Sequence, residues 1–320
     1  MKIIKKLYAL SLISIIILSV ISTMAIGNST QQKNSALSRA LGSSYDDELD
    51  QSMTDYEGSI PLGNTDIFGF PANLSIAQSF IPQMELLTRI KLFMARSQTA
   101  SSPCFLAVRE DLYGENLAVI SAQASQFPVV EDEPTEDDLE WIEFNFDDIW
   151  VAIGETYYLV LYTANITNNF YWVGGNGTNV YPNGSAYFSI DDGQTWEEFI
   201  EDADGCFQTY GLRETFLNVN VEGNIFGPSF MIKNIGEYTA WEVAFMLTVT
   251  GGIMGGVNYE NSGTILSIPS NSETEIQMPL GSIIGIGPIE MTLHISAANV
   301  RDEISIQRNG FIIVFFLFLF

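Results

Sequence analysis

Acidic side chains gather in two short stretches that could bind a divalent cation. "EDADG" places Asp202 and Asp204 two residues apart, and "SIDDGQTW" adds Asp191 and Asp192. Calcium prefers carboxylate and carbonyl oxygens as ligands. These four side chains, with Asp66 as a further partner, are therefore the candidate ligands of a structural calcium ion. The alternative is a pair of hydrated acidic turns, and the sequence leaves both interpretations open.

The stretch "SIDDGQTW" (189–196) fits Ser-x-Asp-x-Gly-x-Thr-Trp, the Asp-box that recurs on the propeller blades of sialidases. In such a hairpin the Asp carboxylate accepts backbone N–H groups of the turn and the Trp packs beneath it. Asp191 and Trp196 stand at these two positions. A sialidase would show several repeats and an arginine cluster, whereas this chain has one box and few arginines. The motif therefore predicts a structural hairpin without catalysis.

Other catalytic constellations are also missing from the sequence. His294 is the single histidine, which excludes a histidine cluster for zinc and would have to serve any Ser-His-Asp triad. The Glu-x-Asp-x-x-Glu pattern of jelly-roll glucanases is absent. The glycine-rich stretches 251–256 and 281–288 are not followed by Lys-Ser/Thr, so they predict turns and not phosphate-binding loops. We therefore do not expect an enzyme, although paired carboxylates keep a glycoside hydrolase as a third possibility.

Charge separates the chain into two parts and excludes one class of partner. The formal net charge is −26, and residues 46–211 carry 29 Asp and Glu against 4 Lys and Arg. Residues 212–320 carry 10 against 4. Nucleic-acid binding needs a basic patch that this sequence does not supply. An anionic membrane surface is excluded by the same argument.

The N-terminus predicts export. Lysines precede a long apolar run that ends in small residues, so 1–25 is expected to be a signal peptide, with an uncleaved membrane anchor as the alternative. Residues 26–49 are polar and are expected to form a flexible linker. In a secreted protein Cys104 and Cys206 can form a disulfide; the alternative is two buried free thiols. Glycosylation sequons begin at Asn28, Asn73, Asn165, Asn176 and Asn183.

Period-two alternation predicts an all-β protein with two domains, 50–211 and 212–320. In "ETYYLVLYT" the face with Leu159 and Leu161 is expected to be the core face. Trp172 and Tyr181 flank the loop "GGNGTN" and are the candidate exposed aromatic residues for ligand binding.

The end of the chain, "GFIIVFFLFLF" (310–320), is continuously apolar. As a helix it would rise only ~15 Å, about half of a bilayer core. We therefore expect this stretch to form the closing strand of the second domain. The part of the strand that stays exposed is the only part of the chain expected to contact a membrane. A membrane anchor is the alternative.

Two family resemblances complete this interpretation. The stretches "AQSFIPQMELLTRIKLFM", "WIEFNFDDIWVAIGETYYLVLYT" and "YPNGSAYFSIDDGQTW" resemble a β-jelly-roll module like carbohydrate-binding modules, found in secreted surface proteins of archaea and bacteria. Around "FMIKNIGEYTAWEVAF" the chain is similar to CARDB-like immunoglobulin-type domains, with Asn234 and Gly236 expected to supply unusual backbone angles in a turn. The resemblance implies a jelly-roll sandwich followed by an immunoglobulin-like sandwich, and it favours a structural calcium near the chain ends of the first.

The function expected from these features is that of a secreted cell-surface protein with a non-catalytic ligand-binding or adhesion role. A glycan or another surface component is the expected ligand. A purely structural protein of the cell envelope is the alternative.

Overall fold

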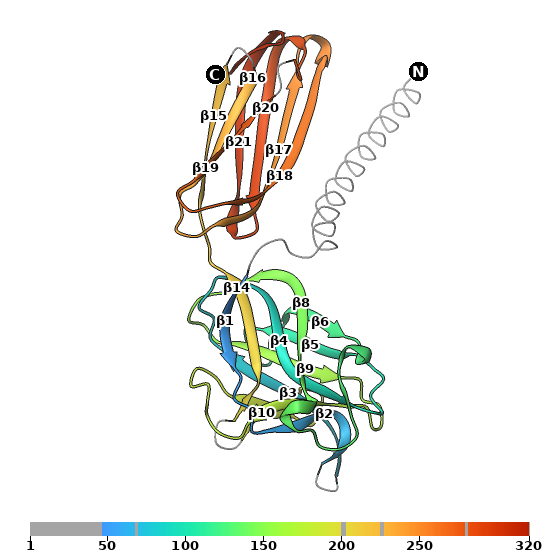
Figure 1. The fold of residues 1–320 in the computed structure, drawn as a ribbon. Helices are drawn as coiled ribbons and strands as arrows, with labels where there is room; N and C mark the ends of the chain where they lie inside the picture. The colour runs from blue at the N-terminus through green and yellow to red at the C-terminus, as the bar shows by residue number, and fades with distance from the viewer. Residues whose placement is uncertain (1–46, 68–69, 200–202, 225–226, 279–280, 320) are drawn as a thin grey trace, which may run out of the picture. The chain divides into compact units, whose positions relative to one another are not determined.

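The computed structural model describes residues 47–320 apart from 68–69, 200–202, 225–226, 279–280 and 320, so the expected signal peptide and residues 26–46 of the expected linker lie outside it (Figure 1). The end of the predicted linker is wrong, because Glu48 and Leu49 begin the first strand. The described residues form mostly antiparallel strands with a few short 3-10 helices and no α-helix. The all-β prediction is therefore confirmed. None of the described helices has the length and apolarity needed to cross a membrane.

The first group of strands is a jelly-roll sandwich. Its elements are β1 (Glu48–Met53), β2 (Gly58–Ile67), β3 (Phe70–Phe80), β4 (Leu86–Ser97), β5 (Cys104–Arg109), β6 (Asn116–Ala122), η1 (Ala124–Gln126), β7 (Val129–Val130), η2 (Glu136–Asp138), β8 (Glu140–Trp150), β9 (Tyr157–Thr163), β10 (Phe170–Asn176), β11 (Ala186–Ser189), β12 (Glu197–Glu198), β13 (Asp204–Gly205) and β14 (Phe207–Leu212).

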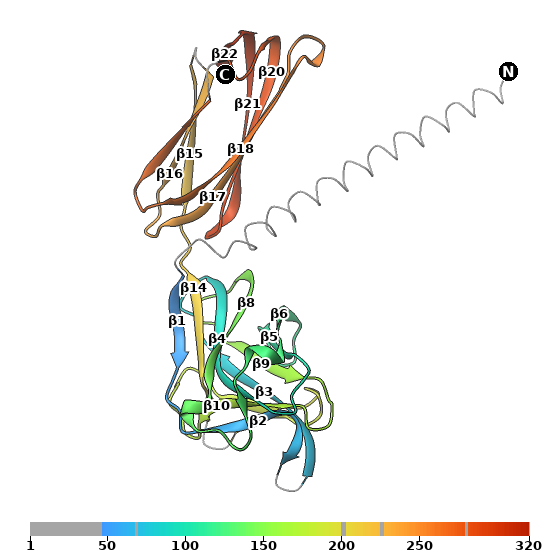
Figure 2. The same ribbon diagram turned by 45° about the vertical axis from the view of Figure 1, so that its right-hand side comes forward.

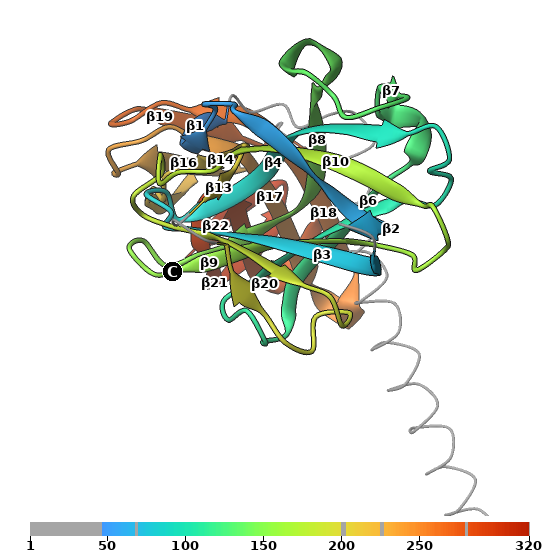
Figure 3. The ribbon, with the colours of Figure 1, turned by 90° about the horizontal axis from the view of Figure 1, so that it is seen from below.

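Strand β3 joins the two layers of this sandwich. Its first half pairs with β2, with Leu74 opposite Gly63. Its second half pairs with β9, with Ile76 opposite Leu161. The hydrogen-bonded order is β1-β14-β4-β10-β2-β3-β9-β5-β6, and β2 lies between β3 and β10 when seen from below (Figure 3).

The core of the jelly roll follows the alternation of its strands. Leu159 and Leu161 of β9 are buried in the main cluster, as the sequence predicts. In β8, Phe144 and Ile142 also face this core, because side chains two apart in a strand share a face. On the other side of β9, the half-buried Tyr158 packs into a smaller cluster.

The second group of strands forms an immunoglobulin-like sandwich with its own core. Its elements are β15 (Leu217–Asn224), β16 (Gly227–Asn234), β17 (Ala240–Gly251), η4 (Ile253–Gly255), β18 (Val257–Ile268), β19 (Glu273–Gln277), β20 (Gly285–Ala297), β21 (Val300–Val314) and β22 (Phe316–Leu319). The sheet β15-β16-β19 faces the sheet β18-β17-β20-β21-β22 (Figure 2). Phe230, Leu247 and Leu293 are buried in this second core.

The Asn-x-Gly turn of this sandwich does not use the unusual backbone angles that the sequence predicts. Neither Asn234 nor Gly236 has a positive φ. Asn234 is fully buried, and its Nδ2 donates to the carbonyls of Tyr238 (2.7 Å) and Ile268 (2.9 Å). A Cβ on Gly236 would lie 2.2 Å from Thr215 Oγ1. The motif therefore serves side-chain hydrogen bonding and close packing.

The apolar C-terminal stretch is β structure, but the prediction of one closing strand over 310–320 is wrong. Strand β21 continues to Val314, which has a φ of 60°, and β22 returns to pair with it, with Phe311 opposite Phe318. Ile312 and Leu317 enter the core, while Phe311 and Phe318 on the other face are exposed. Continuous apolarity hides such a turn, because no glycine, asparagine or proline marks it.

Candidate functional site

A hollow of about 490 Å³ opens in the jelly roll where β2, β3, β10, β11 and β13 meet. Its lining residues are Glu57, Gly58, Ser59, Ile60, Ile76, Val173, Gly174, Gly175, Asn176, Gly177, Ala186, Phe199, Ala203, Asp204 and Gly205. Five of them are glycines, so much of the wall is backbone. We call this hollow the glycine-lined pocket.

Two facing glycines in the lining have different roles. Gly58 of β2 lies directly opposite Gly175 of β10. A Cβ added to Gly58 meets nothing within 4 Å, whereas a Cβ on Gly175 would lie 2.6 Å from the carbonyl oxygen of Asp204. Gly175 is thus required for the close approach of β13, and Gly58 leaves open space.

The pocket combines apolar walls with two polar groups at its rim. Ile60, Ile76 and Phe199 supply apolar surface. Glu57 is exposed, and its Oε2 accepts a long hydrogen bond of 3.3 Å from the N–H of Gly177. Asn176 uses its Oδ1 for the N–H and hydroxyl of Thr178, while its Nδ2 has no hydrogen-bond partner among the described residues. One acceptor and one donor are therefore available to a ligand.

Asp204, also in the lining, has a structural role. It is only 2% exposed, and its Oδ2 accepts the N–H groups of Val180 (3.0 Å) and Tyr181 (2.7 Å). Its Oδ1 accepts Gln78 Nε2 at 3.0 Å. Since a buried carboxylate needs such donors, Asp204 fixes the loop after β10 and thereby the rim of the pocket.

The Asp-box forms the predicted hairpin. Asp191 accepts the N–H of Thr195 (2.8 Å), its hydroxyl (2.6 Å) and the hydroxyl of Ser189 (2.8 Å). The Thr195 hydroxyl, followed by the Thr195 N–H and the Ser189 hydroxyl, lowers the pKa of Asp191 to about 2. Trp196 packs into the smaller cluster, and a Cβ on Gly193 would contact its ring. The box is thus a hydrogen-bonded turn over an aromatic ring.

The candidate aromatic residues of the loop do not form the expected exposed platform. Tyr181 is only 6% exposed and packs edge-to-face on Phe207. Its hydroxyl donates to Gln51 Oε1 at 2.9 Å, which satisfies the polar group of a buried tyrosine. Trp172 is half-buried beside Phe170 and does not line the pocket. The prediction is wrong for Tyr181, because its side chain packs into the core of the jelly roll although the residues before it are exposed.

The expected calcium ligands are only partly described. Asp202 and the side chain of Asp66 lie outside the described residues. Asp192 accepts Asn73 Nδ2 at 2.7 Å, and Asp191 and Asp204 make the bonds given above. Among the described residues no group of three or more His, Cys, Asp and Glu side chains could hold a metal ion. Calcium therefore stays a prediction, to be tested by melting with calcium and with chelator.

The two cysteines are buried, free thiols, so the expected disulfide is not formed. Burial raises the pKa of Cys104 strongly and that of Cys206 to about 12.

The described sequons differ in how available their amides are. Asn73 is engaged by Asp192, and Asn165 Oδ1 accepts Asn64 Nδ2 at 2.7 Å. Asn183 is exposed, and Asn176 stands at the rim of the pocket.

No protein-family model and no curated protein sequence matches the chain. A GH2 β-galacturonidase from Eisenbergiella tayi shares 8% identity at a TM-score of 0.22, over 82% of this chain and 44% of that enzyme. A β-glucuronidase from Bacteroides uniformis shares 9% at 0.21, over 82% and 32%. The chain thus spans less than half the length of these two solved structures, and similarity at this level supports no inference about activity.

Sequence reasoning missed the pocket although it singled out its central loop. The signal was "GGNGTN", which supplies three lining glycines and Asn176. Glycines carry no side chain, so this loop contains few residue types that would indicate a binding surface.

Proposed function

We propose that the jelly roll binds a neutral glycan without hydrolysing it, as part of a secreted cell-surface protein. The observation that carries the proposal is the glycine-lined pocket, with its apolar walls and with the Glu57 carboxylate and the Asn176 amide at its rim. Pockets of this kind bury the apolar part of a small ligand and orient it through a few polar groups. The apolar N-terminal segment supports export.

A sugar ring has both an apolar face and hydroxyl groups, which match the apolar walls and the polar rim of this pocket. Its C–H face can pack against Ile60, Ile76 and Phe199. Its hydroxyls can donate to Glu57 and accept from Asn176 Nδ2. Because the rim carries a carboxylate and the jelly roll is strongly acidic, the site disfavours sialic and uronic acids.

The same geometry argues against hydrolysis. Glycoside hydrolysis uses two carboxyl groups on either side of the scissile bond. Among the described lining residues, Glu57 and Asp204 are the carboxylates. Asp204 is already held by backbone and side-chain donors, so one carboxylate is left for the ligand.

The proposal is tested by calorimetric titration of the full chain with neutral oligosaccharides and with uronic-acid oligosaccharides. We expect saturable binding of neutral sugars, weaker binding of the acidic ones and no release of reducing ends. A chain that binds none of them is better explained as a purely structural envelope protein. Release of reducing ends would make it a hydrolase.

A further inference from the structure

Three segments meet at one end of the immunoglobulin-like sandwich and form an exposed apolar tip. They are the turn after β17 (252–256), the start of β20 (284–287) and the hairpin of β21 and β22 (311–319). Gly285 pairs with Val314, and the N–H of Gly252 donates to the carbonyl of Pro288 at 2.7 Å, which places the three segments together. We call this end the apolar tip.

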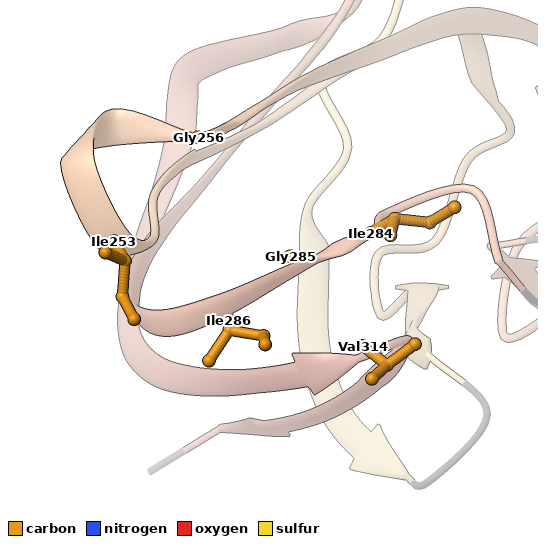
Figure 4. A pocket seen from close by; sticks show the side chains of 6 residues that line it. All are labelled: Ile253, Gly256, Ile284, Gly285, Ile286 and Val314. Atoms are coloured by element: carbon orange, nitrogen blue, oxygen red, sulfur yellow. The ribbon is translucent and has the colours of Figure 1, made fainter.

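The side chains of the tip are exposed to an unusual degree. Met254 is fully exposed, and Ile253 and Ile284 are 63% and 67% exposed. The exposed large apolar side chains at the tip are Ile253, Met254, Ile284, Ile286, Phe311, Ile313, Val314, Phe315, Phe316 and Phe318. A contiguous exposed set of this kind marks an interaction surface. Figure 4 shows Ile253, Ile284, Ile286 and Val314 around a hollow of about 410 Å³.

Charge is absent from every segment of the tip. Residues 251–259, 281–289 and 309–319 contain no Asp, Glu, Lys or Arg, in a chain with 39 acidic residues. The nearest charges along these strands are Glu260, Glu290 and Arg308. Anionic lipid repels an acidic protein. This chain can therefore contact a bilayer favourably only through a surface without carboxylates, and only where the lipid headgroups are neutral.

Part of the backbone of the tip is already hydrogen-bonded within the protein. Polar backbone groups must find partners inside the protein before a segment can leave water. The N–H of Gly256 donates to the carbonyl of Ile253 (3.2 Å), and β22 pairs with β21 over Phe316–Leu319. The phenylalanines add the aromatic side chains that favour the membrane interface.

We propose that the apolar tip inserts into the surface of a neutral lipid bilayer, while the rest of the sandwich stays in water. The tip would enter to the depth of the headgroup and acyl boundary, roughly 5–10 Å. This contact is independent of the glycan pocket, and of the N-terminal apolar segment.

The test uses a fluorophore placed on the tip of the full chain. Met254→Cys is labelled with an environment-sensitive dye and mixed with phosphatidylcholine vesicles; Leu266→Cys, an exposed position (57%) towards the other end of β18, is the matched control. The dye at 254 should shift to the blue and be quenched by brominated lipid, while the dye at 266 should not. Phosphatidylglycerol vesicles should give a smaller shift.

A second variant separates insertion from other effects. Ile253→Glu together with Ile286→Glu should reduce vesicle binding by roughly tenfold or more, because charges would replace apolar surface that the lipid would otherwise cover. Leu266→Glu should leave binding unchanged. An unchanged dye at 254 in the presence of vesicles would overturn the proposal. A blue shift that needs no vesicles and grows with protein concentration would also overturn it, since it would show a second copy at the tip.

Discussion

Gly58 of β2 lies directly opposite Gly175 of β10, and both glycines line the pocket in the jelly roll. Only Gly175 is constrained by close backbone contact, at 2.6 Å from the carbonyl of Asp204. Gly58 is therefore the position where a side chain can fill the pocket without strain.

The first prediction follows from this asymmetry. Gly58→Val should abolish glycan binding, or weaken it by at least roughly tenfold, because the valine side chain fills the pocket. Thermal stability should stay equal or rise, because glycine weakens a strand by about 0.5–1 kcal/mol. Calorimetric titration and thermal melting of the full chain measure both effects. Ser52→Val introduces the same side chain at an exposed position of β1 that does not line the pocket, and this variant should bind normally. Full affinity in Gly58→Val would mean that the glycan binds elsewhere.

The Asp-box gives a prediction that depends on pH. Asp191 has a pKa of about 2 in the folded protein, below the ordinary 3.8, so its carboxylate stabilises the fold above pH 4. That contribution is lost as the pH falls through about 2. Asp191→Asn should therefore melt at a lower temperature than the natural chain at pH 7, and the difference should vanish near pH 2.

The control for this experiment is Glu197→Gln, which removes an exposed carboxylate from the neighbouring strand β12. It should leave the melting temperature nearly unchanged at both pH values. A difference for Asp191→Asn that persists near pH 2 would show that its effect is steric and not carried by the hydrogen bonds of the carboxylate.

The sequence predicts those features of the fold whose residue pattern lies within a single strand. Alternation in β9 assigned Leu159 and Leu161 to the core correctly, because the period of two is local. The pocket depends on the register between β2 and β10, which lie far apart in sequence, so no local pattern announces that Gly58 faces Gly175. The hairpin of β21 and β22 was missed because Val314 adopts a positive φ without a turn residue.

In the candidate site, too, local contacts could be predicted from the sequence and long-range contacts could not. The motif around Asp191 predicted its own hydrogen bonds, since all its partners lie within four residues. The sequence makes Asp204 a candidate calcium ligand, but it does not show that Gln78, from a strand more than 100 residues earlier, donates to its carboxylate. Long-range partners decide whether a carboxylate is free to bind a ligand, and the sequence does not show them.

The buried amide of Asn234 supports a third prediction. Asn234→Ala should destabilise the immunoglobulin-like sandwich by about 2–4 kcal/mol, because the carbonyls of Tyr238 and Ile268 would lose their donor inside the protein. Urea denaturation of the full chain measures the change. Asn218→Ala, on an exposed position of β15, should stay within about 0.5 kcal/mol. Equal stability of the two variants would contradict a structural role for the Asn-x-Gly motif.

The last prediction concerns the thiols. Cys104 is fully buried, and burial raises the pKa of Cys206 to about 12, so neither forms the reactive thiolate at neutral pH. The folded chain should not react with maleimide, and both thiols should react once it is unfolded without reductant. Ser52→Cys, an exposed position, should label at once and shows that the reagent is active. Intact-mass spectrometry counts the labels. An unfolded chain that takes up no label before reduction would contain the disulfide after all, and β5 would then be tied to the segment before β14.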